Sequence, residues 1–249
     1  MKNTIEERGV CGFGGCSIGV TNAAPGKGAP AERRQMHDLT IVSDVICPWC
    51  FLAKKNLDKA LELTDPKLPV EITWRPFELN PTMPKGGIDR REYRSKKFGS
   101  WARSQVLDAQ VAEAGARAGI TFRHDLMART PNTLQAHRLI WLAGEKGLQD
   151  GVVEALFRAY FTEGRDVSET SVLIEIAARA GIDKEHASAF LSGTVGTDEV
   201  RFEAQTAMSR GISGVPTFIL DGEAIFSGAL KPDLMAVRLR EAVFAHEKQ

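Results

Sequence analysis

The sequence predicts an α/β domain that carries a large all-helical insertion, and three observations lead to this fold class. Two strand-like segments near the start of the chain are separated by a helical pattern. Two further strand-like segments stand near its end, and the residues from about 88 to 211 show helical periods alone. Because two isolated strands cannot form a stable sheet, the early and late strands are expected to share one sheet.

The early segments predict a parallel strand–helix–strand unit. "LTIVSDVI" (39–46) is short, mostly apolar and β-branched, as is typical of a strand. Apolar residues then recur at helical spacing from Phe51 to Leu61, and "VEITWRPFEL" (70–79) alternates between apolar and polar residues. A short return between two such strands favours a parallel pair with a right-handed crossover.

The later segments predict a series of helices, a hairpin and a closing helix. Glycines end the successive helical patterns, as they often do at helix C-termini. "VPTFILDG" (215–222) and "EAIFSGA" (223–229) predict an antiparallel hairpin with its turn around Asp221 and Gly222. The segment that follows is amphipathic, and Pro232 falls in the first turn of the helix it predicts.

These elements divide the chain into three parts. Residues 1–36 are rich in glycine, alanine, proline and charge without an apolar period, so they are expected to form a flexible leader. The α/β domain is expected to comprise residues 37–84 and 212–249. The helical insertion is expected to comprise residues 85–211.

The composition is that of a soluble globular protein, with 43% hydrophobic and 26% charged residues. Lysine plus arginine equals aspartate plus glutamate at 32 each, so the charge predicts neither nucleic-acid nor membrane binding. The start of the chain lacks the apolar region of a secretory signal, which favours a cytoplasmic location. "RREYRSKKF" (90–98) is expected to be a solvated helix face, and anion binding is the other interpretation. A monomer or a homodimer fits this composition.

Two cysteines stand where the first strand ends and the first helix begins. The free N–H groups and the dipole of a helix N-terminus favour a thiolate at Cys47. Cys50 lies three residues on, on the same helical face and within disulfide reach. Pro48 suits the first helical position, where a missing N–H costs nothing. The motif therefore predicts that Cys47 attacks a substrate sulfur and that Cys50 resolves the mixed disulfide.

Two other interpretations of this pair remain open. The cysteines could be two buried residues that happen to lie three apart, or they could bind zinc together with Cys11 and Cys16. Cys11 and Cys16 stand in the predicted leader, however, and structural zinc pairs more often come from tight turns. Redox chemistry is favoured, no metal and no cofactor are expected, and Cys11 and Cys16 are an accessory thiol pair without an assigned role.

A second motif, "GISGVPTF", places Pro216 at the start of a predicted strand, where a proline does not interrupt the ladder and a cis bond is well placed. "VICPWC" and "GISGVPTF" together resemble the thioredoxin superfamily, and the long helical insertion is similar to that of the DsbA group. "RTPNTLQAHRLIWLA" and "AIFSGAL" resemble the FrnE-like DsbA-family oxidoreductases, over most of residues 38–246.

The resemblance implies a thioredoxin-like fold interrupted by a helical domain. It implies Cys47 as the nucleophile, Cys50 as the resolving cysteine, and a cis peptide between Val215 and Pro216 beside the pair. In that family the backbone before the cis proline pairs with an extended substrate segment. The expected substrate is a thiol or disulfide of a protein, a peptide or glutathione. The expected substrate-binding residues are Pro48, Trp49, Val215, Pro216, Asn132 and His137.

Asn132 and His137 also have a simpler interpretation. Asn132 and Thr133 precede a predicted helix and are expected to cap it. His137 lies one turn beyond Thr133 on the same face, where it could face the redox site and assist proton transfer to a thiolate.

Two other functions share this architecture. One is a glutathione-dependent enzyme similar to 2-hydroxychromene-2-carboxylate isomerase or the kappa-class glutathione transferases, which activate bound glutathione without two cysteines in the turn. The other is a zinc-binding or chaperone-like module whose helices bind peptides. The intact Cys47–Cys50 pair favours thiol–disulfide exchange.

Overall fold

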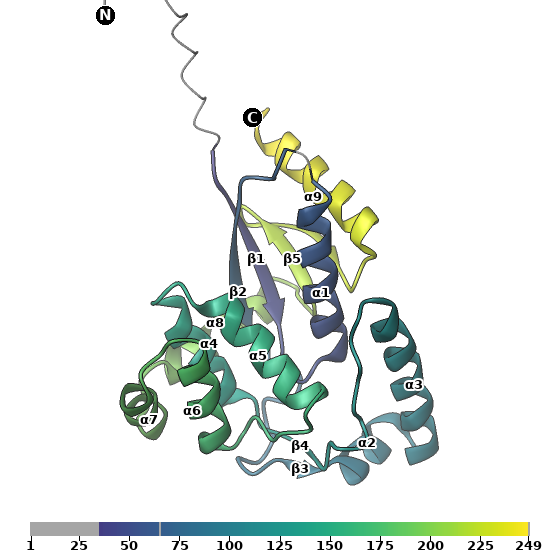
Figure 1. Cartoon of the computed structure of the whole chain (residues 1–249), viewed down its shortest axis with the longest axis vertical. Coiled ribbons are helices and arrows are strands. Elements are labelled where there is room, and N and C mark those ends of the chain that lie inside the picture. Colours follow the sequence, from purple (N-terminus) through teal and green to yellow (C-terminus); the bar gives the residue numbers. More distant parts are fainter. Residues whose placement is uncertain (1–34, 65, 249) are drawn as a thin grey trace, which may run out of the picture. The chain divides into compact units, whose positions relative to one another are not determined.

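The computed structural model describes residues 35–64 and 66–248, so nearly all of the predicted leader, with Cys11 and Cys16, lies outside the described residues (Figure 1). The strands are β1 (His37–Ser43), β2 (Val70–Pro76), β3 (Ile88–Asp89), β4 (Arg129–Thr130), β5 (Thr217–Leu220) and β6 (Glu223–Ser227). The helices are α1 (Pro48–Glu62), α2 (Arg90–Phe98), α3 (Trp101–Arg117), α4 (Leu134–Gly144), α5 (Gln149–Phe161), α6 (Thr170–Arg179), α7 (Lys184–Ser192), α8 (Thr197–Ser209) and α9 (Pro232–His246).

The early and late strands form one mixed sheet, as the sequence predicts. Its strand order is β2-β1-β5-β6, with β1 parallel to β2 and antiparallel to β5, and β5 antiparallel to β6. Helix α1 joins β1 to β2, which confirms the predicted parallel strand–helix–strand unit. Ile41 of β1 lies between Trp74 of β2 and Phe218 of β5, so the centre of the sheet is apolar. This strand order and the crossover through α1 agree with the thioredoxin-like fold that the resemblance implies.

The predicted hairpin is confirmed at its turn. Asp221 and Gly222 connect β5 to β6, and both have positive φ angles, 47° and 87°. Two consecutive positive φ values define the type I′ turn, which matches the twist of an antiparallel pair. Pro232 begins helix α9, as predicted, because its missing N–H is not needed there.

Seven helices, α2 to α8, lie between β2 and β5 in the described part of the chain. The expectation of helices alone in this region was wrong in one respect. Strands β3 and β4 form a two-stranded ribbon, with Ile88 opposite Thr130 and Asp89 opposite Arg129. Strands of two residues are too short to show a period, so no alternation in the sequence reveals them.

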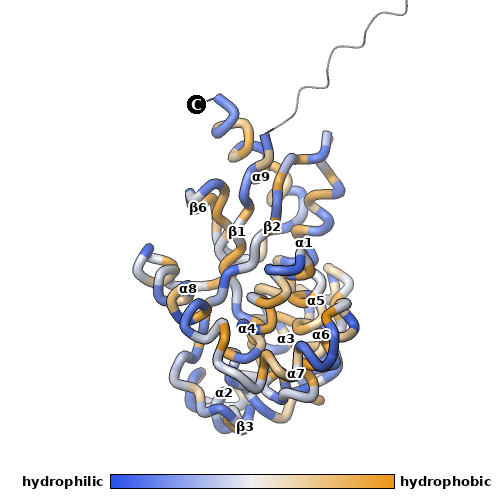
Figure 2. The backbone as a smooth tube through the Cα atoms, turned by 90° about the vertical axis from the view of Figure 1, so that its left-hand side faces the viewer, coloured by the Kyte–Doolittle hydropathy of each residue, from blue (hydrophilic) through white to orange (hydrophobic). Residues whose placement is uncertain are grey.

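The core runs without a break from the sheet into the helices. Leu39 and Ile41 of β1 pack in one cluster with Leu57 of α1, Leu156 of α5 and Leu239 of α9. Figure 1 shows α1 and α9 side by side next to the sheet, and Figure 2 shows the hydrophobic stretch of α5 close to α1. A smaller cluster on the opposite side of β1 joins Val42, Phe77 and Ala207 of α8.

Polar side chains connect the helices to the exposed edge of the sheet. Gln149, at the start of α5, accepts from the backbone N–H of Trp74 at 2.7 Å and donates to its carbonyl oxygen at 3.1 Å. The side chain thus pairs with β2 as a neighbouring strand would, which protects this edge.

Lys54 of α1 is buried and lies 2.6 Å from Asp58 and 3.1 Å from Asp150 of α5.

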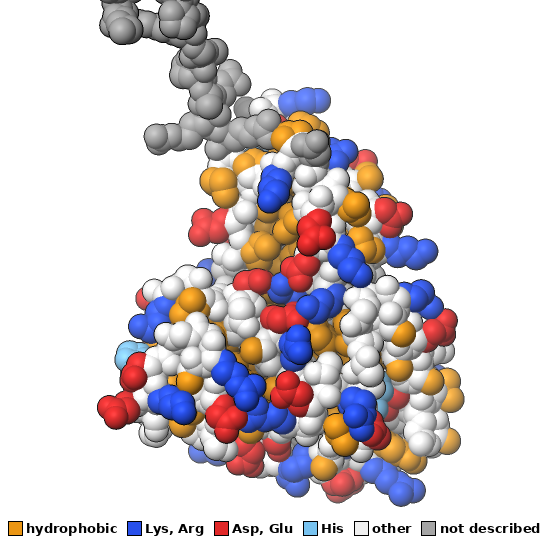
Figure 3. All heavy atoms as spheres, viewed as in Figure 1, with side chains coloured by type: hydrophobic (Ala, Val, Ile, Leu, Met, Phe, Trp, Pro, Cys, Tyr) orange, Lys and Arg blue, Asp and Glu red, His pale blue; other side chains and the backbone are white. Residues whose placement is uncertain are grey.

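The surface carries no dominant charge on the face shown in Figure 3, where lysine and arginine side chains are interspersed with aspartate and glutamate. This agrees with the formal net charge of zero. Among the described residues, no helix is long and apolar enough to span a bilayer.

Candidate active site

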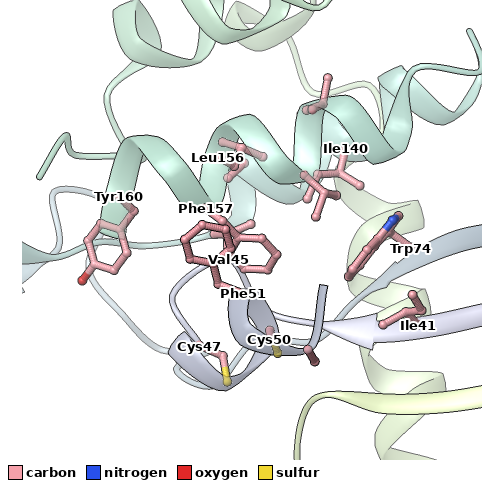
Figure 4. Close-up of a cluster of buried hydrophobic side chains, with 14 of the residues drawn as sticks. Ile41, Val45, Cys47, Cys50, Phe51, Trp74, Ile140, Leu156, Phe157 and Tyr160 are labelled. Atoms are coloured by element: carbon pink, nitrogen blue, oxygen red, sulfur yellow. The ribbon is translucent and has the colours of Figure 1, made fainter. Parts of the chain in front are cut away.

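Cys47 is the residue that precedes helix α1. Its backbone is extended, with φ −90° and ψ 111°, and Pro48 takes the first helical position. The N–H of Cys47 donates to the carbonyl of Asp44 at 2.9 Å, and the N–H of Cys50 donates to the carbonyl of Cys47 at 3.0 Å. Figure 4 shows both sulfurs at the start of α1, next to the buried aromatic cluster. The helix therefore begins at the pair, as the sequence predicts.

The two thiols lie in different surroundings. Cys47 is 5% exposed and lines a cavity of about 380 Å³, whereas Cys50 is fully buried. Burial raises the pKa of the Cys50 thiol well above its usual range, and the adjacent Cys47 side chain raises it further. The hydroxyl of Ser43 and the backbone N–H of Asp44 oppose this shift. Cys50 therefore stays protonated at neutral pH, and Cys47 is the thiol that a substrate can reach.

The peptide between Val215 and Pro216 is cis and lies beside Cys47. The sulfur of Cys47 lies 3.6 Å from the carbonyl oxygen of Val215, within reach of an S–H donor. Val215 and Gly214 line the cavity, while Pro216 is buried and does not line it. A group that reaches the Cys47 sulfur would therefore also meet the backbone of Gly214 and Val215.

Trp49 and Pro48 complete the rim on the helix side. Both line the cavity, and Trp49 is 42% exposed, which is unusual for a large aromatic residue. Of the six residues that the sequence proposes for substrate binding, the structure brings three to the cavity (Pro48, Trp49 and Val215).

His137 does not line the cavity. It is buried on α4, and its Nε2 atom makes no hydrogen bond but lies 3.5 Å from Oδ1 of Asp44. Asp44 is fully buried, and its other oxygen accepts from the N–H of Leu79 at 2.8 Å. Asp44 and His137 thus form a buried carboxylate–imidazole pair just after β1. The backbone of Asp44 also hydrogen-bonds the thiol of Cys50.

Asn132 lies away from the redox pair. Its Nδ2 donates to the carbonyl of Met83 at 2.7 Å, and its Oδ1 accepts from the N–H of Leu134 at 3.0 Å. The second bond fulfils the expected capping role at the start of α4, where Thr133 makes no side-chain cap bond. Asn132 lines a different hollow from Cys47, so the structure does not bring it to the cavity.

Helices α2 and α3 close the cavity opposite Cys47. Its apolar lining includes Ile46, Leu79, Leu107, Val111, Met127 and Phe161. The expectation that residues 90–98 form a solvated helix face was wrong for Arg90, which is 4% exposed, and for half-buried Arg94. Both guanidinium groups lie 2.7 Å from the carboxylate of Asp108 on α3, which draws these side chains inward.

Sequence reasoning missed two parts of this site. Asp44 carries a local signal, because an acidic residue at the end of an apolar strand and three positions before Cys47 is unusual. No sequence signal indicates the contact of Asp108 with Arg90 and Arg94, because an Asp in an amphipathic helix is ordinarily exposed to solvent.

Metal binding by the described residues finds no support, because no group of three or more His, Cys, Asp or Glu residues among them could hold an ion. The predicted alternative of a four-cysteine zinc site includes Cys11 and Cys16, which lie outside the described residues. Cys47 and Cys50 are both free thiols in the structure.

The chain is similar to a probable DsbA oxidoreductase from Streptomyces coelicolor, at 31% identity. The match covers 83% of this chain and 89% of that one, with a TM-score of 0.76. An uncharacterised protein of Bacillus subtilis, YwbO, is 26% identical over 197 residues, which is 79% of this chain and 92% of YwbO.

The fold is also shared with a cytosolic disulfide reductase, DsbM, from Pseudomonas aeruginosa. That structure is 20% identical, covers 84% of this chain and 99% of its own, and has a TM-score of 0.61. The family described as the DSBA-like thioredoxin domain matches residues 38–240, which include both cysteines and the cis proline. The chain belongs to this family of DsbA-like thiol oxidoreductases.

Proposed function

We propose that the chain exchanges disulfides with protein or small-molecule thiols through Cys47 and Cys50. The observation that carries the proposal is the asymmetry of the pair. Cys47 lines a cavity at a helix N-terminus, and Cys50 is buried and protonated. This asymmetry supports Cys47 as the attacking thiol and Cys50 as the resolving thiol.

The exchange has two steps. The thiolate of Cys47 attacks one sulfur of a substrate disulfide, and the other substrate sulfur leaves as a thiolate that takes up a proton. Cys50 then loses its proton and attacks the sulfur of Cys47, which releases the second substrate thiol and leaves a Cys47–Cys50 disulfide. Two electrons pass from the protein to the substrate, and the same steps in reverse oxidise a substrate dithiol.

The rim of the cavity supports the choice of thiol and disulfide substrates. Trp49 offers an exposed aromatic face, and the backbone of Gly214 and Val215 offers hydrogen-bonding groups beside the Cys47 sulfur. A substrate segment paired there would place its sulfur against Cys47. A structure of the P. aeruginosa reductase DsbM holds glutathione, which supports small thiols among the substrates of this chain.

The buried pair of Asp44 and His137 fits the second step. Cys50 must lose a proton in a place that water does not reach, and burial opposes that loss. The backbone of Asp44 bonds Cys50, and the carboxylate of Asp44 lies 3.5 Å from His137. We infer that this pair receives the Cys50 proton and returns it to the leaving thiol.

Cysteine variants test the assignment. Cys47→Ser should abolish reduction of insulin, because no thiolate remains to attack. Cys50→Ser should retain the attack and accumulate a mixed disulfide on Cys47, since nothing resolves it. Intact-mass spectrometry after reaction with a small disulfide would detect this adduct.

A double variant, Cys11→Ser with Cys16→Ser, is the matched control and should exchange disulfides as the unmodified chain does. Exchange that persists in Cys47→Ser, or that is lost only in the control, would contradict the proposal. Stoichiometric zinc in the purified protein would favour the zinc-binding alternative. The glutathione-dependent isomerase, the cytoplasmic location and the monomeric or dimeric state stay predictions from the sequence.

A further inference from the structure

The cavity in front of Cys47 carries more positive than negative charge. Among the described residues that line it, Arg90, Arg94 and Lys97 are cationic, and Asp108 is the only carboxylate. His124, also in the lining, lies 4.0 Å from Asp108, and burial lowers its pKa, so it is neutral at neutral pH. The lining therefore carries three cations and one anion, together with uncharged polar and apolar side chains.

Asp108 accepts hydrogen bonds from only some of the N–H groups of Arg90 and Arg94. Arg94 donates to Asp108 from Nη2 at 2.7 Å and to the hydroxyl of Ser104 from Nε at 2.5 Å. Its Nη1 atom makes no hydrogen bond to any described residue, and the side chain is 17% exposed. Arg90 donates to the second oxygen of Asp108 from a single nitrogen, also at 2.7 Å. Two guanidinium groups share the one carboxylate of Asp108, so the wall keeps an excess of positive charge that is complementary to an anion.

The rest of the cavity sets the size and polarity of the ligand. A volume of about 380 Å³ is that of a small-molecule site, too small for a folded partner. Leu107, Val111, Met127 and Phe161 would surround an apolar body. Cys47 and Val215 lie on the same cavity, so the ligand that fills it also meets the redox sulfur.

We propose that this cavity binds a small organic carboxylate with an apolar body, and that Arg94 is its main anchor. Resting on the proposed function, the preferred substrates are carboxylate-bearing small thiols and disulfides. Lys97 supplies a second cation at the exposed end of the cavity, where its ammonium lies 2.8 Å from the hydroxyl of Tyr93. The Nη1 group of Arg94 is the one left to donate to a ligand, and its charge-assisted hydrogen bond to a carboxylate is stronger than one to a neutral amide oxygen.

The first experiment measures binding without any exchange chemistry. Hydrocinnamate and its primary amide share the same apolar body and differ in charge. The acid should bind the protein about tenfold or more tightly than the amide by ligand-detected NMR titration, because a charge-assisted bond replaces a neutral one. Arg94→Gln should remove this preference and Arg94→Lys should retain part of it. Equal affinity for the two ligands, or binding of neither, would overturn the proposal.

Two further variants separate the site from general effects. Arg91→Gln removes the same charge from an exposed position of the same helix, and it should keep the preference for the acid. Lys97 lines the cavity but forms no ion pair with Asp108. Lys97→Gln should therefore weaken the preference for the acid over the amide, and it serves as the test if Arg94→Gln does not fold. Loss of the preference in Arg91→Gln, or no change in Lys97→Gln, would count against the assigned anchors.

The second experiment uses the exchange reaction. Dithiodipropionate and bis(hydroxyethyl) disulfide carry the same disulfide with and without carboxylates. The unmodified protein should show the higher kcat/KM for dithiodipropionate, and Arg94→Gln should lower that value about tenfold through KM. Equal losses for both disulfides would mean that Arg94 acts on Cys47 and not on the ligand. Absence of exchange with either disulfide, with acid binding intact, would refute the exchange function and leave the binding site standing.

Discussion

At the residue scale, the proposed function gives the buried Asp44–His137 pair a part in only one of the two proposed exchange steps. Cys47 lines an open cavity, so its attack does not need a proton acceptor in the interior. Cys50 has no such access, and its thiol is hydrogen-bonded by the side chain of Ser43 and the backbone of Asp44. A defect in the buried pair should therefore affect resolution and spare attack.

His137→Gln and Asp44→Asn are expected to lengthen the lifetime of the mixed disulfide about tenfold or more, as the loss of general acid–base assistance does. Release of the first substrate thiol should stay close to its normal rate. Acid-quenched mass spectrometry of the Cys47 adduct would measure the two steps separately at several pH values. The variants should also change the pH dependence of the resolving step.

His186→Gln is the matched control, because His186 is exposed on α7, remote in the sequence from the redox motif. It should leave both steps unchanged. If His137→Gln slows attack and resolution equally, the histidine has a structural role and no part in proton transfer.

At the scale of single elements, the β5–β6 hairpin has a turn that could be predicted and side-chain hydrogen bonds to β1, here called the Asp221 clamp, that could not. Positive φ at Asp221 and Gly222 follows from local residue preferences, so the turn could be predicted. The carboxylate of Asp221 also accepts from Nδ1 of His37 at 2.6 Å and from the N–H of Asp38 at 2.8 Å. These bonds join the hairpin to β1, more than 180 residues earlier in the chain, and no local pattern indicates them.

Asp221→Asn should lower the free energy of unfolding by about 1 kcal/mol at neutral pH, because the charged acceptor is lost while the turn is retained. Partial burial raises the pKa of Asp221, but the bonds from His37 and Asp38 outweigh it and hold the pKa below its usual 3.8. The stabilisation is therefore complete above 3.8 and disappears as the pH falls through the lower folded-state value. Urea denaturation of both proteins across this range would measure it, and a difference that does not shrink in acid would contradict the clamp.

Helix α2 shows what local patterns leave out. Its ends could be predicted, since Asp89 accepts from the N–H of Glu92 and Gly99 adopts a positive φ of 88°. The direction in which its arginines point could not. That direction depends on Asp108, which comes from the next helix, and on the β3–β4 ribbon, which is two residues long.

At the scale of the whole described chain, the fold class, the sheet and the position of the two cysteines at the start of α1 could be predicted, because each rests on local periods and motifs. The contacts between the helices and the sheet could not. Phe51 of α1 stacks on Phe157 of α5 with ring centroids 5.3 Å apart, and Phe157 meets the edge of Trp74 of β2 at 6.4 Å. This aromatic cluster, visible in Figure 4, joins the helix that begins at Cys47 to the helices that the sequence predicts as a separate insertion.

Because the core is continuous across this junction, residues 37–248 are expected to unfold in a single transition in which far-ultraviolet circular dichroism and tryptophan fluorescence coincide. Phe157→Ala should lower the free energy of unfolding by about 3–5 kcal/mol, through lost burial and the cavity it leaves. Both signals should shift together in this variant. Phe244→Ala removes the same side chain from a position on α9 that is 52% exposed, so it should change stability little. Two separate transitions, with only one moved by Phe157→Ala, would show instead that the helical segment folds independently of the sheet.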